Sequence, residues 1–331
     1  DSCLVGSEMC IRDRLSLSLL SQSVLSWRVS VGCSIESFWA TRSVRARFGV
    51  LGRLQSECPR MSPNPSPLTP LAAIGEWVVK GGLAIVGFLA FLGELLIVIA
   101  QVSLRPHRWR VRSAVNHMWA AGVAALPIVG LLSFLIGVVT AYQGAAQLAR
   151  FGAEIFIVNV IGVGVLREMG ALIAAIVVAG RSASAFAAQI GSMNVNEEVD
   201  ALKTMNIDPV EILVVPRVIG LFLIFPFIVF FSDMMGILGG LLMSTVALNI
   251  TVTQFATQFQ HTVPLSDLWV GLSKAPLFAF TIAMIGCFQG LSAARSAESV
   301  GQKTTAAVVQ SIFLVIAIDA VLSVLYAALG I

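Results

Sequence analysis

The chain has 331 residues, of which 57% are hydrophobic and only 12% are charged, and its mean hydropathy is +0.90. Soluble domains are usually about a quarter charged, and several stretches here exceed the roughly 18 apolar residues that indicate a bilayer-spanning helix. The composition therefore excludes an ordinary soluble domain and indicates an integral membrane protein. The formal net charge of +3 comes from the first sixty residues, so it gives no support for a nucleic-acid partner.

Residues 1–60 differ from the rest of the chain. They hold 8 of the 21 Lys and Arg residues and four of the five cysteines, and they show no helical or strand period. We expect a leader that is non-native, with the natural chain beginning near Met61; the alternative is a real but disordered extension. Residues 61–70 contain SPNPSPLTP, which is typical of a loose cytosolic tail.

The first apolar stretch, Leu71–Leu104, is interrupted by Glu76, Lys80 and Glu94. It predicts either a spanning helix or an elbow helix that lies in the membrane interface. The sequence RPHRWRVR follows at positions 105–112, with four arginines and a tryptophan. Arginine is retained on the cytosolic side and tryptophan favours interfaces, so this patch is expected at the level of the cytosolic headgroups.

Five clearer spans follow, and they are Trp119–Tyr142, Val165–Gly191, Val218–Asn249, Leu268–Leu291 and Thr304–Leu329. The third would be about 48 Å long as one helix, against a membrane core of about 30 Å, so it is either one long helix bent near Pro226 or a hairpin. One helix places Arg295 and Lys303 in a cytosolic loop, as the positive-inside tendency requires. We therefore predict an all-α integral membrane protein with about five transmembrane helices, an N-terminal interfacial or elbow helix, and its C-terminus outside.

The segment between the second and third spans predicts a short amphipathic cytosolic helix. Its apolar residues recur at spacings of four, three and three and so share one helical face: Val195, Val199, Leu202 and Met205. Its acidic residues fall largely elsewhere: Glu197, Glu198 and Asp200. Asn194 is predicted to cap a helix of about 12 residues, with Glu197 completing a capping box, and Asp208-Pro209 predicts that the next helix begins there. Such a helix either couples the membrane domain to a soluble partner or rests on the membrane surface.

Small residues recur every four positions in the second and third spans. They form three sets: Gly180, Ser184 and Ala188; Ala183, Ala187 and Gly191; Gly236 and Gly240. This spacing lets membrane helices approach closely, either within one chain or in a dimer.

Ionisable residues inside membrane spans are costly and are candidates for function. Arg167 and Glu168 open the second span, and Lys274 and Asp319 lie within the fourth and fifth. Glu168 is expected to hold a polar network at the mouth of a cavity or to reach the interface. Lys274 and Asp319 are expected to form an intramembrane pair, to line a substrate path, or to lie near the span boundaries.

The sequence offers no sign of catalysis by the chain itself. It contains no G-x-x-x-x-G-K-[ST] phosphate-binding loop, no Ser/His/Asp arrangement, and no Cys/His spacing typical of a metal site. Outside residues 1–60 its one cysteine is Cys287, and its three histidines are scattered. We expect no cofactor and no metal in this chain, so that ATP and Mg²⁺, if they are used, bind a separate ATPase.

Several motifs in order resemble the MlaE/YrbE family of ABC-transporter permeases. They are LREMG at 166–170, VAGRS at 178–182, QIGSM at 189–193, EEVDAL at 197–202, Asp208-Pro209, VPR at 215–217, TTAAVVQS at 304–311 and Asp319. The resemblance covers residues 71–331, which we expect to form the permease domain. It implies a multi-pass homodimer in the bacterial inner membrane that moves phospholipids between the inner and outer membranes.

The resemblance also implies partners and site residues. The partners are two ABC ATPase subunits, a periplasmic MCE-domain protein and, in some systems, a STAS-domain protein. Residues 194–206 are then the coupling helix, and Glu168 lies near a lipid cavity between the two permease copies. Two other functions stay open: an ion-coupled secondary transporter that uses Lys274 and Asp319, and a membrane scaffold that recruits partners through residues 194–206.

Overall fold

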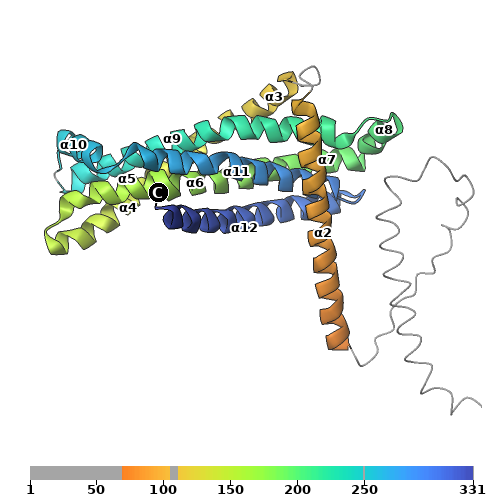
Figure 1. Cartoon of the computed structure of the whole chain (residues 1–331), viewed down its shortest axis with the longest axis horizontal. Helices are drawn as coiled ribbons and strands as arrows, with labels where there is room; N and C mark the ends of the chain where they lie inside the picture. The colour runs from red at the N-terminus through yellow and green to blue at the C-terminus, as the bar shows by residue number, and fades with distance from the viewer. Residues whose placement is uncertain (1–68, 105–110, 249, 331) are drawn as a thin grey trace, which may run out of the picture. The chain divides into compact units, whose positions relative to one another are not determined.

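The structure is a computed structural model, and it describes residues 69–104, 111–248 and 250–330. The predicted leader, most of the Pro-rich tail and most of the arginine-rich patch lie outside the described residues. By its internal contacts the chain divides into two units, Asp1–Ala73 and Ile74–Ile331, and the second unit holds nearly every described element. These described residues form helices and their connections without any strand (Figure 1), which confirms the all-α prediction.

Long helices alternate with short helical turns along the chain. The first half of the described chain contains α2 (Thr69–Ser103), α3 (Val111–Ala121), η2 (Val123–Ala125), α4 (Leu126–Leu148), η3 (Ala149–Phe151), η4 (Glu154–Phe156), α5 (Ile157–Gly164), η5 (Val165–Met169), α6 (Gly170–Val178), η6 (Ala179–Ala183) and α7 (Ser184–Val195). The second half contains α8 (Glu198–Thr204), η7 (Val210–Val214), α9 (Val215–Leu248), α10 (Val252–Thr262), α11 (Leu265–Leu291) and α12 (Ala297–Leu329).

Among the described residues, six helical stretches are long and apolar enough to cross a membrane. Four of them contain predicted spans whole, a fifth contains the predicted span Val218–Asn249 except for Asn249, which lies outside the described residues, and the sixth is Ile85–Val102 of α2. By length and composition this part of α2 is therefore able to span a membrane, and the elbow-helix alternative stays a prediction. The stretch Ile157–Val195 is built from α5, α6 and α7 joined by the wide π-helical turns η5 and η6.

The third predicted span is one long helix, and the hairpin alternative is wrong. Helix α9 continues the turn η7 without interruption and runs through Pro226. It stays intact because it is packed along its length, with Leu221, Phe225 and Ile228 fully buried. Helix α11 lies beside it in Figure 1, and both α4 and α11 contact it.

Glycines let these helices pack at short range. A Cβ added at Gly137 of α4 would overlap the backbone of Gly236 in α9, and a Cβ at Gly240 would lie 2.7 Å from Ile161. In α11, Gly286 and Gly290 lie against the backbone of Ala183 and Ala187. Two of the predicted small-residue sets thus lie at contacts within the chain, where a methyl group would force the helices apart.

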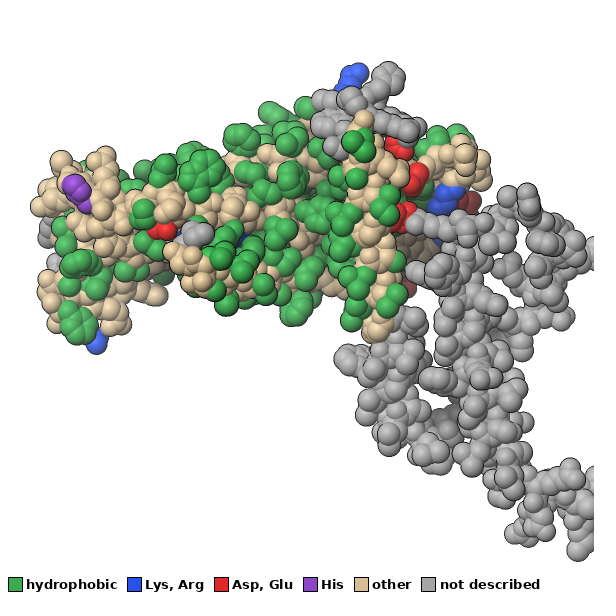
Figure 2. Space-filling view, viewed as in Figure 1, with side chains coloured by type: hydrophobic (Ala, Val, Ile, Leu, Met, Phe, Trp, Pro, Cys, Tyr) green, Lys and Arg blue, Asp and Glu red, His purple; other side chains and the backbone are tan. Residues whose placement is uncertain are grey.

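The outer surface of the bundle is largely apolar. Figure 2 shows hydrophobic side chains over the middle of the face in view, while acidic side chains gather near the end that carries α8. Large exposed residues include Phe227 and Phe313, the latter with 72% of its surface exposed. A soluble monomer rarely exposes apolar patches of this extent, so this surface is suited to contact with lipid.

Candidate functional site

A cluster of charged side chains is buried where three helical segments meet. The ammonium group of Lys274 in α11 lies 2.7 Å from Glu168 Oε2 in η5 and 3.0 Å from Asp319 Oδ1 in α12. It also donates a hydrogen bond of 3.0 Å to Ser323 Oγ, and Ser323 donates to the Glu168 carboxylate at 2.9 Å. The structure thus brings together three of the four ionisable residues that were selected from the sequence.

Lys274 is fully buried, and all three of its N–H donors are used. An ammonium group has three donors and no acceptor, and here they go to Glu168, Asp319 and Ser323. Lys274 therefore joins η5, α11 and α12 rather than offering a free positive charge to a ligand. The Glu168 side chain is 32% exposed, so the cluster reaches the surface at this carboxylate.

Arg167 points to a different partner from its neighbour Glu168. Its guanidinium lies 3.5 Å from Asp267 Oδ1 at the start of α11. Both Arg167 and Glu168 belong to the π-helical turn η5, and wide turns of this kind are frequent at functional sites. The turn directs adjacent side chains to separate partners in α11, so this end of α11 is attached to η5 by two ion pairs.

The short helix α8 lies at the opposite end of α11 from α10 (Figure 1). It is shorter than predicted and begins differently. Asn194 does not cap it, because the Asn194 amide donates to the backbone oxygen of Ala293. Glu197 takes the N-cap position with a left-handed backbone (φ +61°) and no side-chain capping bond. The chain must turn sharply between α7 and α8, and this conformation makes the turn. By contrast, Asp208 does accept a hydrogen bond of 2.9 Å from the Val210 N–H at the start of η7.

The predicted apolar face of α8 is only partly available to a partner. Val199 is buried against the rest of the chain, while Met205 has 60% of its surface exposed. Leu202 and Val195 are intermediate, and Glu197 and Glu198 are exposed. The helix therefore uses Val199 to pack and presents acidic residues and Met205 outward.

Arg295 ties α8 to the beginning of α12. Its guanidinium lies 3.0 Å from Glu197 Oε1 and also contacts Asp200 Oδ2. Hydrogen bonding and charge from Lys203, with a further contribution from Arg295, hold the pKa of the exposed Asp200 carboxyl below its usual value. The two carboxylates and one guanidinium form a small exposed network that links α8 to the α11–α12 connection.

The remaining predicted small-residue set, Gly180, Ser184 and Ala188, shows no such close approach at its glycine among the described residues. A Cβ added at Gly180 would meet open space, and the Ser184 hydroxyl bonds to its own helix at Gly180 O. Ala188 is half-buried. Their part in helix packing stays a prediction.

One buried polar group in α9 was not predicted from the sequence. Both carboxylate oxygens of Asp233 are buried and lack a hydrogen-bond partner among the described residues. Next to it, Ser232 Oγ lies 2.7 Å from Ser133 Oγ and donates to Gly170 O. The sequence did contain a sign of this buried group, because Asp233 interrupts a long apolar run and charged residues within spans are rare.

Comparison with known proteins gives a consistent result. A family model described as Permease MlaE matches residues 114–325, which include both the buried charge cluster and α8. The chain is 38% identical over 195 residues to a probable ABC transporter permease protein of Rickettsia typhi. This match covers 59% of this chain and 75% of that protein. It is 36% identical over 214 residues to a probable ABC transporter permease protein of Synechocystis, covering 64% of this chain and 81% of that protein.

A further relative carries a more specific name. The chain is 30% identical over 263 residues to the intermembrane phospholipid transport system permease protein MlaE of Haemophilus influenzae. This match covers 78% of this chain and 98% of that protein, so it extends over nearly the whole length of the relative.

Proposed function

Because the chain belongs to the MlaE family of ABC-transporter permeases, we propose that it is the membrane subunit through which phospholipids move between the inner and outer membranes of a bacterium. The chain is a permease and a multi-pass membrane protein, and ATP hydrolysis is assigned to a separate ABC ATPase. The match of the family model over residues 114–325 carries this proposal. The name of the Haemophilus influenzae relative supports phospholipid as the substrate.

The proposed route for mechanical work is α8. This helix is exposed, acidic and held between two long apolar stretches, so a soluble ATPase has a rigid element to grip. Arg295 connects α8 to α12, and α12 carries Asp319 of the buried charge cluster. A movement of α8 would therefore also move α12, which supplies Asp319 to the buried charge cluster.

Lipid extraction explains why such work is needed. Exposing an acyl chain to water costs about 0.8 kcal/mol for each methylene, so a lipid must move through a shielded path. We expect that path to lie between two copies of the chain, with Glu168 near its opening. A periplasmic MCE-domain protein is the expected receiver or donor of the lipid, and a STAS-domain protein is an expected further subunit.

The proposal is tested by reconstitution. The chain is purified with its candidate ATPase, placed in proteoliposomes, and the movement of labelled phospholipid to acceptor vesicles is measured with and without ATP. We expect movement that requires ATP and a hydrolysis-competent ATPase. Movement driven by a proton gradient without ATP would instead identify an ion-coupled transporter, and no movement under either condition would leave the chain as a membrane scaffold.

A further inference from the structure

Asp233 lies in the interior of the bundle without a partner for a negative charge. It belongs to the middle of α9, and its side chain is fully buried by the surrounding helices. Neither of its carboxyl oxygens has a hydrogen-bond partner among the described residues. Burial of an unpaired carboxylate is so unfavourable that such a group takes up a proton instead. The form of Asp233 that suits this position is therefore the neutral carboxylic acid.

The hydroxyl groups next to Asp233 do not supply a donor to it. Ser232 donates to the backbone oxygen of Gly170 at 2.9 Å. Ser133 Oγ of α4 lies 2.7 Å from Ser232 Oγ. A hydroxyl group has one hydrogen to donate, and because Ser232 uses its own on Gly170, Ser133 is the donor in this pair. Both hydroxyl hydrogens are thus used, and neither stabilises a charge on Asp233.

The charged side chains around α9 do not compensate Asp233 either. Helix α9 packs mainly against α3, α4, α5, α6, α10, α11, η5 and η7. The titratable residues of these elements are Arg112, His117, Tyr142, Arg167, Glu168, Glu211, His261, Asp267, Lys274 and Cys287. None of them forms a hydrogen bond with Asp233, and α5 and α6 contribute no titratable residue at all. Within α9 the one cation is Arg217, which is about 24 Å away along the helix.

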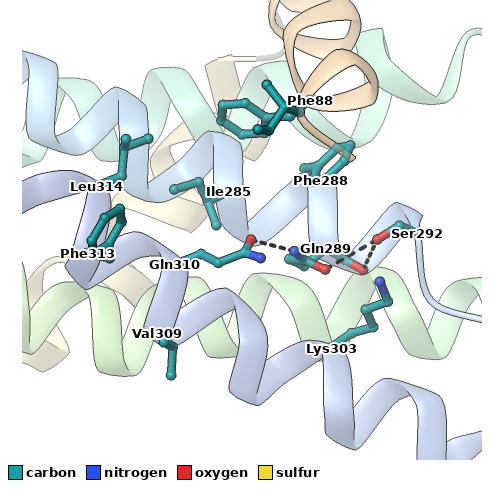
Figure 3. Close-up of a pocket in the computed structure, with 11 residues that line it drawn as sticks. Phe88, Ile285, Phe288, Gln289, Ser292, Lys303, Val309, Gln310, Phe313 and Leu314 are labelled. Carbon is teal, nitrogen blue, oxygen red and sulfur yellow. Dashed lines mark hydrogen bonds between the residues drawn. The ribbon is translucent and has the colours of Figure 1, made fainter. Parts of the chain in front are cut away.

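The space around Asp233 is too small for a hydrated ion. A Cβ added at Gly170 would overlap Asp233 Oδ1, so the carboxyl group lies directly against the backbone of α6. A largely apolar cavity of about 550 Å³ lies elsewhere, between α2, α11 and α12, with Phe88 and Lys303 in its lining (Figure 3). Neither Asp233 nor Gly170 belongs to that lining. The ligand that fits at Asp233 is therefore a proton, which needs no added volume.

We propose that Asp233 is a proton-binding site whose occupancy follows the packing of α9 against α6. While Oδ1 lies against Gly170, the carboxyl group keeps its proton. A movement that separates the two helices lets water reach the group, and the O–H bond then breaks, which gives the proton to water and leaves a carboxylate. Gly170 directly follows η5, which carries Glu168, so the same contact connects this proton to the position of the buried charge cluster. This inference does not depend on the proposed function.

A proton held in the packed state makes stability depend on pH in one direction. An exposed carboxyl group loses its proton above roughly pH 4, so in the unfolded chain Asp233 is ionised at neutral pH. The packed chain then binds one proton more than the unfolded chain, and stability falls as the pH rises. For one proton, the ratio of folded to unfolded protein falls about tenfold per pH unit. Asn has the same shape and is neutral at every pH, so Asp233→Asn removes this component.

Infrared spectroscopy detects the proton directly. The full chain and Asp233→Asn are purified in detergent at neutral pH, and their difference spectrum should contain the carbonyl stretch of a protonated carboxylic acid. This band should shift when the water is replaced by D₂O. Asp200→Asn is the matched control, because it alters a surface aspartate that is paired with Lys203 and Arg295. Its difference spectrum should contain a carboxylate band and no acid band.

Unfolding between about pH 5 and 8 gives a second measurement. Relative to Asp233→Asn, the unsubstituted chain should lose stability about tenfold per pH unit, and Asp200→Asn should behave like the unsubstituted chain. Asp233→Ala answers the same question where the amide does not pack. Equal pH dependence in the unsubstituted chain and the Asp233 variants, or the absence of any acid band from the unsubstituted chain at neutral pH, would overturn the proposal. So would stabilisation by sodium over potassium at constant ionic strength that Asp233→Asn abolishes, because the site would then hold a metal cation.

Discussion

Lys274 is a fully buried ammonium group that holds two carboxylates from different helices. Removing one member of a buried ion pair leaves uncompensated charge and costs about 3–5 kcal/mol. We therefore expect Lys274→Met to lower the thermal stability of the purified protein strongly, because Glu168 and Asp319 lose their shared partner. Thermal unfolding in detergent, followed by tryptophan fluorescence, measures this.

Lys203 offers the matched control for that change. Its side chain is 60% exposed and pairs with Asp200 on the same short helix, so Lys203→Met should alter stability by about 0.5 kcal/mol or less. Equal effects of the two substitutions would show that the buried cluster does not join the helices. Adding Asp319→Asn to Lys274→Met should recover part of the loss, since one unpaired charge is then removed.

Gly170 and Asp233 form a second test at the level of single residues. A Cβ at Gly170 would overlap Asp233 Oδ1, and Asp233 is fully buried, so its carboxylate has little room to move. We expect Gly170→Ala to be destabilising in the natural background by about 1–3 kcal/mol, as overpacking is. In an Asp233→Ala background the same change should cost much less, because the overlapping atom is gone.

A double-mutant cycle in detergent measures the coupling between these two positions. Contacting residues show interaction energies of about 0.5–3 kcal/mol, and additive effects of the two changes would contradict the contact. Gly180→Ala serves as the control, because a Cβ there meets open space within the chain and should change the stability of the monomer little.

At the level of elements, Arg295 in the α11–α12 connection is one link to α8, through its ion pairs with Glu197 and Asp200. Exposed ion pairs contribute only about 0–1 kcal/mol, so Arg295→Ala should leave the unfolding temperature nearly unchanged. We nevertheless expect it to reduce ATP-driven lipid movement while ATPase binding persists, since α8 would move without pulling α12. Lys203→Ala removes a pair within α8 but leaves the link intact, and it should transport normally. Normal transport in Arg295→Ala would rule out this link as the path of coupling.

Met205 tests whether α8 is the docking element. It is the most exposed apolar residue of the predicted coupling face, so a charge there should weaken ATPase binding without disturbing the fold. We expect Met205→Asp to lose co-purification with the ATPase and to keep normal membrane insertion. Gln260→Asp alters an exposed residue of α10, at the other end of the bundle, and should co-purify as before. Retained binding by Met205→Asp would exclude this face.

At the level of the whole molecule, the proposal requires α8 and α10 to lie on opposite sides of the membrane. The two helices occupy opposite ends of the bundle in Figure 1. With the cysteines of residues 1–60 replaced by serine, the buried Cys287 is the remaining thiol. We expect Met205→Cys to react with an impermeant maleimide only after spheroplasts are permeabilised, and Gln260→Cys to react in intact spheroplasts. The reverse pattern would place α8 outside and end the coupling proposal.

The number and type of the membrane helices were predictable because they depend on local patterns in the sequence. Apolar runs longer than the membrane core predict helices wherever they occur, and they located all five clearer spans. The order of short motifs from LREMG to TTAAVVQS was enough to select the family. The positive-inside tendency also favoured one helix over a hairpin for the stretch around Pro226, because one helix places Arg295 and Lys303 in a cytosolic loop.

The local patterns were less reliable at helix ends. Asn194 was predicted to cap α8, yet its side chain bonds to Ala293, nearly a hundred residues away. A capping preference is worth only about 1 kcal/mol, so a tertiary hydrogen bond and the tight turn at Glu197 outweigh it. The boundary therefore depends on which helices pack nearby.

By itself, the sequence determined that this protein is a bundle of membrane helices with an exposed acidic helix and a few costly charges within its spans. Only the tertiary structure decided which of those charges meet: Lys274 lies 106 positions from Glu168 and 45 from Asp319. It also decided that Lys303 stands unpaired, among the described residues, at the end of an apolar cavity. Hydropathy depends on neighbours along the chain, whereas ion pairs depend on how each helix is rotated and packed against segments far away in sequence.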